Sequence, residues 1–176
     1  MNGRTCLITG ATDGIGKETA IGMAKNGYNL ILIGRNEEKG KKVSDEIRKI
    51  ADSIDIDFFK ADLVLMKEVS RVADEVCQKY DRIDVLINNV GAYFAFRDVT
   101  EEGFERTFAL NHLGYFLMTK KLLDLVEASD YARIVSVSSS AHYGTSFEFD
   151  NLNGEKKYRG FKTYQKSKLA NVMFTY

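Results

Sequence analysis

The sequence contains no proline, although average usage of about 5% would give about nine in a chain of 176 residues. Net charge is also absent, because 25 lysines and arginines balance 25 aspartates and glutamates. This balance argues against a nucleic-acid partner and against a polybasic membrane surface. No apolar run reaches the roughly 18 residues of a membrane span, and the N-terminal "MNGRTCLITG" lacks the layout of a signal peptide. We therefore expect a cytoplasmic protein without a membrane span.

Cysteine is scarce as well. Cys6 and Cys77 lie far apart and form no CxxC pattern. Cys6 falls in an apolar, strand-like run, where a buried thiol is the usual outcome. The two histidines, His112 and His142, have no partner that the sequence suggests. We expect neither a redox pair nor a metal site.

Strand-like and helix-like segments alternate along the chain. Apolar runs predict five strands, at "RTCLITG", "YNLILIGR", "IDIDFFKAD", "RIDVLINN" and "ARIVSVSS". Helical spacing predicts the segments between them, including a long helix from about Glu101 to Ala128 and a terminal helix with Thr163 as its N-cap. Several strands are almost continuously apolar, as expected where helices cover both faces of a sheet. The pattern predicts an α/β fold with a doubly wound parallel sheet of the Rossmann type, in one domain spanning residues 1–176.

A glycine-rich loop, "TGATDGIG", joins the first predicted strand to the first predicted helix. Gly10, Gly14 and Gly16 punctuate it. Glycine allows a ligand to approach the backbone closely, and the free N–H groups of the following helix suit a pyrophosphate. A tight turn that only packs strand against helix is the simpler alternative. In its strand–loop–helix context the pattern predicts dinucleotide binding.

The end of the second predicted strand bears on the choice of cofactor. An acidic residue there would bind the adenine ribose hydroxyls and repel a 2′-phosphate. The sequence has "LIGRN" instead, with Gly34 at the acidic position and Arg35 after it. A guanidinium can bind a phosphate with two hydrogen bonds. The residues favour NADP(H), with NAD(H) as the alternative and a surface role for Arg35 as the simpler reading.

The pattern Tyr-x-x-x-Lys occurs twice near the C-terminus, and each copy could place a phenol beside an ammonium one helical turn away. Tyr158 pairs with Lys162 in the first copy, and Gly160 between them weakens a helix by up to about 1 kcal/mol. Tyr164 and Lys168 begin an uninterrupted helix-forming run. The second pair is therefore the better candidate for acid–base chemistry, and the first is expected in a surface loop.

Further motifs follow the glycine loop in a fixed order. They are "ADL" at 61–63, "NNVG" at 88–91, "FALNHLG" around Asn111, "RIVSVSS", and "YQKSKLAN". This ordered set, which covers the whole chain, resembles the short-chain dehydrogenase/reductase family. The region from "GEKKY" to "YQKSKLAN" is most similar to retinol-dehydrogenase-like members. Val90 and Ser136 depart from the family pattern, which has Ala and Asn there.

The resemblance implies a role for each matched residue. It implies cofactor contacts at Gly10, Thr12, Gly14, Ile15, Gly16, Arg35, Asp62, Leu63, Asn89, Gly91, Tyr164 and Lys168. Ser139 would polarise the substrate carbonyl, and Tyr164 would transfer the proton. Lys168 would lower the pKa of Tyr164 and bind the nicotinamide ribose, while Asn111 would hold a water molecule linked to Lys168. The family motif also includes a serine before the lysine, which Ser167 supplies.

Two classes of function follow from the resemblance. The first is an NADP(H)-dependent oxidoreductase that interconverts a small-molecule carbonyl and alcohol. The second is a truncated, non-catalytic nucleotide-binding or interaction module, because the chain ends inside the predicted catalytic helix. The family fold continues with two more strands and helices, including a proline-containing cofactor segment. A sugar epimerase is disfavoured, since its glycine spacing would be Gly-x-x-Gly-x-x-Gly.

The same resemblance bears on the surfaces of the protein. Relatives commonly dimerise through the long helix, at about residues 103–128, and the terminal helix, so a homodimer is a candidate assembly. The fifth predicted strand would lie at an exposed edge of the sheet.

Overall fold

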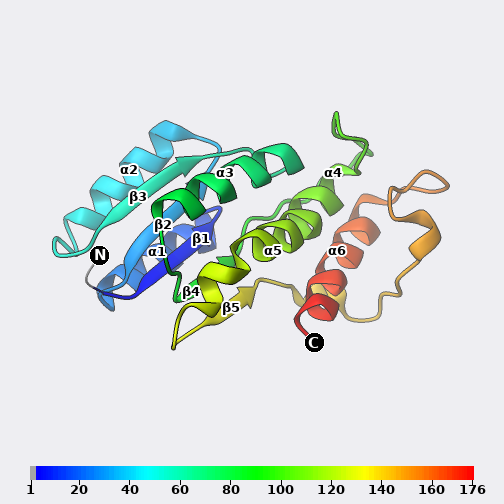
Figure 1. Ribbon diagram of the computed structural model, residues 1–176. Helices are drawn as coiled ribbons and strands as arrows, with labels where there is room; N and C mark the ends of the chain where they lie inside the picture. The colour runs from blue at the N-terminus through cyan, green and yellow to red at the C-terminus, as the bar shows by residue number, and fades with distance from the viewer. Residues whose placement is uncertain (1–2) are drawn as a thin grey trace.

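A five-stranded sheet forms the centre of the computed structural model, which describes residues 3–176 (Figure 1). The strands are β1 (Thr5–Thr9), β2 (Asn29–Gly34), β3 (Ile56–Lys60), β4 (Val85–Asn88) and β5 (Arg133–Ser136). They lie in the order β3-β2-β1-β4-β5, and every pair is parallel. The predicted doubly wound parallel sheet is therefore confirmed. β5 forms one edge, where Ile134 and Val135 remain 37% and 44% exposed.

Helices cover both faces of this sheet. They are α1 (Gly14–Lys25), α2 (Glu37–Arg48), α3 (Met66–Lys79), α4 (Arg106–Phe108), the π-helical turn η1 (Ala109–Leu113), α5 (Gly114–Glu127), the 3-10 turns η2 (Ser140–His142) and η3 (Phe149–Asn151), and α6 (Gly160–Thr175). Cys6 and Ile8 of β1 pack with α1 and α2, whereas Leu7 packs with α3 and α5 on the other face. Neighbouring strand residues are thus both buried, which explains why the strands are almost continuously apolar.

Two helix boundaries differ from the prediction. The long helix begins at Arg106 rather than near Glu101, because Glu105 caps it by accepting from the N–H groups of Thr107 and Phe108. It is also interrupted by the π turn η1 before it continues as α5.

The terminal helix begins at Gly160, so Thr163 is not its N-cap but lies in its first turn. The Thr163 N–H donates to the carbonyl oxygen of Arg159 at 2.9 Å, as the first turn of a helix requires. A Cβ atom at Gly160 would lie 2.6 Å from the carbonyl oxygen of Phe94. Glycine is needed for this close approach, which sequence propensity cannot reveal.

Cys6 is fully buried in β1, as predicted, and burial raises the pKa of its thiol to about 12. Cys77 is exposed on α3.

Within residues 3–176, no helix is both long enough and apolar enough to cross a membrane. The cytoplasmic location stays a prediction.

Candidate functional site

The turn from β1 into α1 has no room for a side chain at Gly10 or Gly16. A Cβ atom at Gly16 would lie 2.2 Å from the carbonyl oxygen of Gly10 and 2.5 Å from Nδ2 of Asn89. Gly10 has a φ of 69°, in the left-handed region that favours glycine. Asn89 holds the turn, since its Nδ2 donates to the Thr9 carbonyl oxygen at 2.9 Å. The loop is therefore held with its backbone bare, as a closely approaching phosphate requires.

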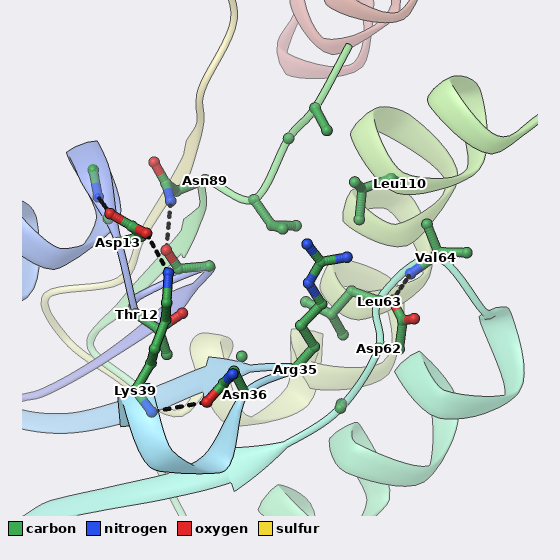
Figure 2. Close-up of a pocket in the computed structure, with 18 of the residues that line it drawn as sticks. Thr12, Asp13, Arg35, Asn36, Lys39, Asp62, Leu63, Val64, Asn89 and Leu110 are labelled. Carbon is green, nitrogen blue, oxygen red and sulfur yellow. Dashed lines mark hydrogen bonds and ion pairs between the residues drawn. The ribbon is translucent and has the colours of Figure 1, made fainter. Parts of the chain in front are cut away.

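A cavity of about 490 Å³ opens beside this loop, at the carboxyl ends of the strands (Figure 2). It lies near the boundary of β1 and β4, where the strand order reverses, which is the usual ligand site of parallel α/β sheets. The predicted cofactor residues that line it are Gly10, Thr12, Gly14, Ile15, Gly16, Arg35, Asp62, Leu63, Asn89 and Gly91. Of the predicted cofactor residues, Tyr164 and Lys168 are the two that do not line this cavity.

The end of β2 has a steric reason for its glycine. A Cβ atom at Gly34 would lie 2.7 Å from Cγ2 of Thr12. Any acidic side chain at position 34 would therefore collide with Thr12 of the glycine loop. The next side chain, Arg35, is exposed and lines the cavity. This leaves a cation, and no carboxylate, at the end of β2.

The sequence analysis missed three polar residues of the cavity lining, Asp13, Asn36 and Lys39. Asn36 is the N-cap of α2, and its side-chain oxygen accepts from the Lys39 N–H at 2.9 Å. The Lys39 ammonium donates to the Asp13 carboxylate at 2.7 Å and lowers the pKa of Asp13. The signal was present in "RNEEK", because asparagine before two glutamates is typical of a helix N-terminus. Recognising it would have put the first turn of α2 beside Arg35.

Lys168 of α6 is almost fully buried, with 4% of its surface exposed. Its Nζ donates to the carbonyl oxygen of Val137 at 3.0 Å and lies 5.9 Å from the ring centroid of Tyr164. Burial lowers the pKa of Lys168 to about 8. Tyr164 is half-buried one turn earlier on the same helix. The structure thus brings the predicted phenol and ammonium together.

Ser138 and Ser139, which follow β5, have different environments. The Ser138 hydroxyl donates to the main-chain carbonyl of Lys168 at 2.7 Å. Ser139 caps η2, where its Oγ accepts from the Ala141 N–H at 3.2 Å and its hydroxyl hydrogen remains free for another acceptor. Gln165 ties this turn to α6 by donating to the Ala141 carbonyl oxygen at 2.8 Å. Ser138 is therefore occupied in holding α6, whereas the hydroxyl hydrogen of Ser139 has no acceptor among the residues that the structure describes.

Asn111 is fully buried in the π turn η1, a feature that often marks functional sites. Its Oδ1 accepts from the Ala92 N–H at 2.9 Å, and its Nδ2 donates to the Ala92 carbonyl oxygen and to Ser167 Oγ, both at 3.0 Å. Its main-chain carbonyl accepts from Asn171 at 2.9 Å. Asn111 thus joins the segment after β4 to α6. The water molecule predicted beside it stays a prediction.

Gly91 connects the cavity to this group of side chains. It lines the cavity, and a Cβ atom there would lie 3.3 Å from both Lys168 Nζ and Asn111 Oδ1. Lys168 and Asn111, two of the predicted catalytic residues, therefore lie directly behind Gly91 in the wall of the cavity.

Tyr158 has a structural role in the loop before α6. Its hydroxyl donates to the carbonyl oxygen of Phe94 at 3.0 Å and lies 3.3 Å from the buried Glu105 carboxylate. Lys162, its partner in the first Tyr-x-x-x-Lys copy, is exposed in the first turn of α6 and not in the preceding loop. The first copy therefore forms no acid–base pair within this site.

Comparison with known proteins places this site in a family. A family model described as short chain dehydrogenase matches residues 4–176. The chain belongs to the short-chain dehydrogenase family. Retinol dehydrogenase 13 of Homo sapiens is 40% identical over 174 residues, which are 98% of this chain and 53% of that protein. Polyprenol dehydrogenase of Homo sapiens is 37% identical over 177 residues, which cover 98% of this chain and 54% of that protein.

Solved structures agree with this assignment. A crystal structure of a protein from Mycobacterium paratuberculosis matches 98% of this chain and 60% of its own with a TM-score of 0.85 and 35% identity. A short chain dehydrogenase from Escherichia coli CFT073, crystallised with NADPH, matches 99% of this chain and 69% of its own with a TM-score of 0.77 and 27% identity. The chain spans about half the length of the two human relatives.

Proposed function

We propose that this chain carries the cofactor site and the catalytic residues of an NADP(H)-dependent oxidoreductase that interconverts a carbonyl and an alcohol. One observation supports this most directly. The buried ammonium of Lys168 lies 5.9 Å from the ring centroid of Tyr164 and beside Gly91, which lines the large cavity. In this proposal Tyr164 transfers the proton and Lys168 supplies the positive charge beside it.

The residues around the cavity fit a nicotinamide dinucleotide. The bare turn at Gly16, where a Cβ atom would lie 2.2 Å from a carbonyl oxygen, suits a pyrophosphate beside the N-terminus of α1. Arg35 would bind the 2′-phosphate, with NAD(H) as the alternative cofactor if it does not. When bound, the nicotinamide ring donates or accepts the hydride. The E. coli relative crystallised with NADPH supports this choice.

The protein's own residues would orient and protonate the substrate. Ser139 would donate its hydroxyl hydrogen to the carbonyl oxygen and polarise it. Tyr164 would then give its proton to that oxygen, and in the reverse direction it would remove the proton from the alcohol. Lys168 would stabilise the resulting phenolate, and Asn111 would keep the segment at Gly91 in register with α6.

The substrate class is proposed from the relatives. Two of them are named for retinol and polyprenol, both alcohols. We therefore propose retinaldehyde and a polyprenal as first members of a panel of aldehydes and ketones.

A homodimer through α5 and α6 is proposed from the exposed rings of Phe116 and Phe161 on these helices. Light scattering after size-exclusion chromatography tests this assembly.

The decisive experiment compares two tyrosine variants. Tyr164→Phe is expected to bind NADPH like the wild type and to lose carbonyl reduction by about a hundredfold or more. Tyr158→Phe removes the hydroxyl of the other Tyr-x-x-x-Lys copy, so it should keep the activity and lose about 1 kcal/mol of unfolding free energy. NADPH fluorescence measures binding, and NADPH oxidation measures turnover. Reduction near the wild-type rate by Tyr164→Phe contradicts the assigned role.

A non-catalytic nucleotide-binding or interaction module is the second candidate, since the cavity beside the glycine loop can hold a nucleotide whether or not a reaction follows. Binding of NADPH without turnover on any carbonyl of the panel would favour it.

A further inference from the structure

An ion pair in the lining of the cavity joins the N-terminal ends of α1 and α2 (Figure 2). The Lys39 ammonium of α2 lies 2.7 Å from Oδ2 of Asp13, the N-cap of α1. The other carboxylate oxygen of Asp13 accepts from the Gly14 N–H at 2.9 Å. Both side chains are more than half exposed, at 54% for Lys39 and 77% for Asp13. Exposed pairs of this kind are weak and exchange partners readily.

The pair lines the same cavity as Arg35, the cation that the proposed function assigns to the 2′-phosphate. Arg35 precedes Asn36, which caps α2 and accepts from the Lys39 N–H at 2.9 Å. Lys39 is therefore held in the first turn of α2, four positions after Arg35, and both residues line the same cavity. Asp13 and Asp62 are the charged side chains of opposite sign in that lining. A phosphate bound by Arg35 would compete with Asp13 for the ammonium of Lys39.

We propose that Lys39 is a second ligand of the cofactor's 2′-phosphate, and that Asp13 competes for Lys39 and so limits the preference for a phosphorylated nucleotide. This inference rests on the proposed function, because it concerns the cofactor of that site. An ammonium is attracted more strongly to a phosphate dianion than to a carboxylate. Lys39 therefore leaves Asp13 and binds the 2′-phosphate when the nucleotide binds. The simpler role of the pair, to tie α1 to α2, predicts no selectivity between nucleotides.

The test uses two small probes that differ only in the 2′-phosphate, 2′,5′-ADP and 5′-AMP, with isothermal titration calorimetry. Lys39→Gln is expected to raise the Kd for 2′,5′-ADP about tenfold and to leave the Kd for 5′-AMP within about twofold. Asp13→Asn should lower the Kd for 2′,5′-ADP about threefold. Asparagine retains the side-chain oxygen that caps α1, so the helix start is preserved. Lys41→Gln, an exposed charge of α2 outside the cavity lining, is the control and should change neither constant.

The double variant separates competition for Lys39 from direct repulsion of the phosphate. If Asp13 acts through Lys39, Asp13→Asn has no further effect in a protein that already carries Lys39→Gln. The same threefold gain in both backgrounds overturns the competition. If Lys39→Gln leaves the ratio of the Kd values for 2′,5′-ADP and 5′-AMP unchanged, Lys39 is not a ligand of the 2′-phosphate.

The outcomes also distinguish this inference from the proposed function. If the wild-type protein binds neither probe and does not bind NADPH, both the proposed function and this inference are wrong. A wild-type protein that binds both probes, with a Lys39→Gln variant of unchanged selectivity, removes this inference alone.

Discussion

The hydroxyl of Ser138 donates to the main-chain carbonyl of Lys168 at 2.7 Å, so the residue next to the proposed catalytic serine holds the helix that carries Tyr164 and Lys168. The three serines after β5, at positions 138, 139 and 140, are therefore not interchangeable. One fastens α6 to the end of the sheet, and its neighbour Ser139 keeps a hydroxyl hydrogen for a ligand.

Alanine substitutions at positions 138 and 139 test the different roles assigned to these two serines. Ser138→Ala removes a hydrogen bond and is expected to lower the free energy of unfolding by about 1 kcal/mol. Ser139→Ala removes the cap of η2, so it should cost a similar amount, about 1 kcal/mol, but it should also reduce kcat for carbonyl reduction by about a hundredfold. Urea unfolding and NADPH oxidation measure the two effects. A Ser139→Ala protein of full activity, or one whose main defect is stability, contradicts the assignment.

The glycine loop predicts a contrast within one helix. Gly16→Ala puts a methyl group 2.2 Å from the Gly10 carbonyl oxygen, so the loop must shift, with a loss of about 2 kcal/mol or more and of NADPH binding. Gly22 lies on the same helix, and a Cβ atom there would have no neighbour within 4 Å. Gly22→Ala is therefore expected to bind NADPH normally and to gain up to about 1 kcal/mol from helix propensity. Equal NADPH affinity in both variants would contradict a phosphate site at the loop.

Burial of the charged Lys168 side chain is expected to destabilise the folded protein. Burial lowers its pKa from 10.5 to about 8, so the unfolded chain binds more protons than the folded one between these values. The contribution of Lys168 to the free energy of unfolding therefore increases as pH rises from about 8 to about 10. Lys168→Met is expected to stabilise the protein by about 1 kcal/mol at pH 7 and to abolish turnover.

The carbonyl oxygen of Val137 stays satisfied in that variant, because Asn171 also donates to it at 3.3 Å. Unfolding of both proteins across pH 7 to 10 gives the difference attributable to Lys168, since the other titrating groups are shared. A difference that does not shrink with rising pH would mean that the ammonium is not destabilised by burial.

Sequence patterns predicted the fold and ten of the residues that line the cavity, while the roles of the site residues stay predictions. The almost continuously apolar strands indicated a sheet covered on both faces, and the cores around Leu7 on one side and Ile8 on the other confirm it. The glycine spacing indicated a bare turn, and the space around Gly16 agrees. Helix propensity and motif order chose Tyr164 over Tyr158, whose hydroxyl serves the loop before α6.

Other features depended on contacts between segments far apart in the chain. The start of α6 at Gly160 depends on the carbonyl oxygen of Phe94, 66 positions earlier, and a count of helix propensities contains no such contact. In the sequence, Gly34 stands where an acidic residue would be expected. The structure shows that Thr12 occupies the space that a side chain at position 34 would need.

What the sequence determined by itself is therefore the order of the elements, their apolar faces and the residues that can carry the chemistry, because periodicity and turn preference act over a few positions. Only the tertiary structure decided which of these residues meet. The strand order β3-β2-β1-β4-β5 brings Arg35, Lys39 and Asp13 to one cavity, and it brings Ser138 to the carbonyl of Lys168. Such contacts follow from the packing of whole elements and leave no local pattern in the chain.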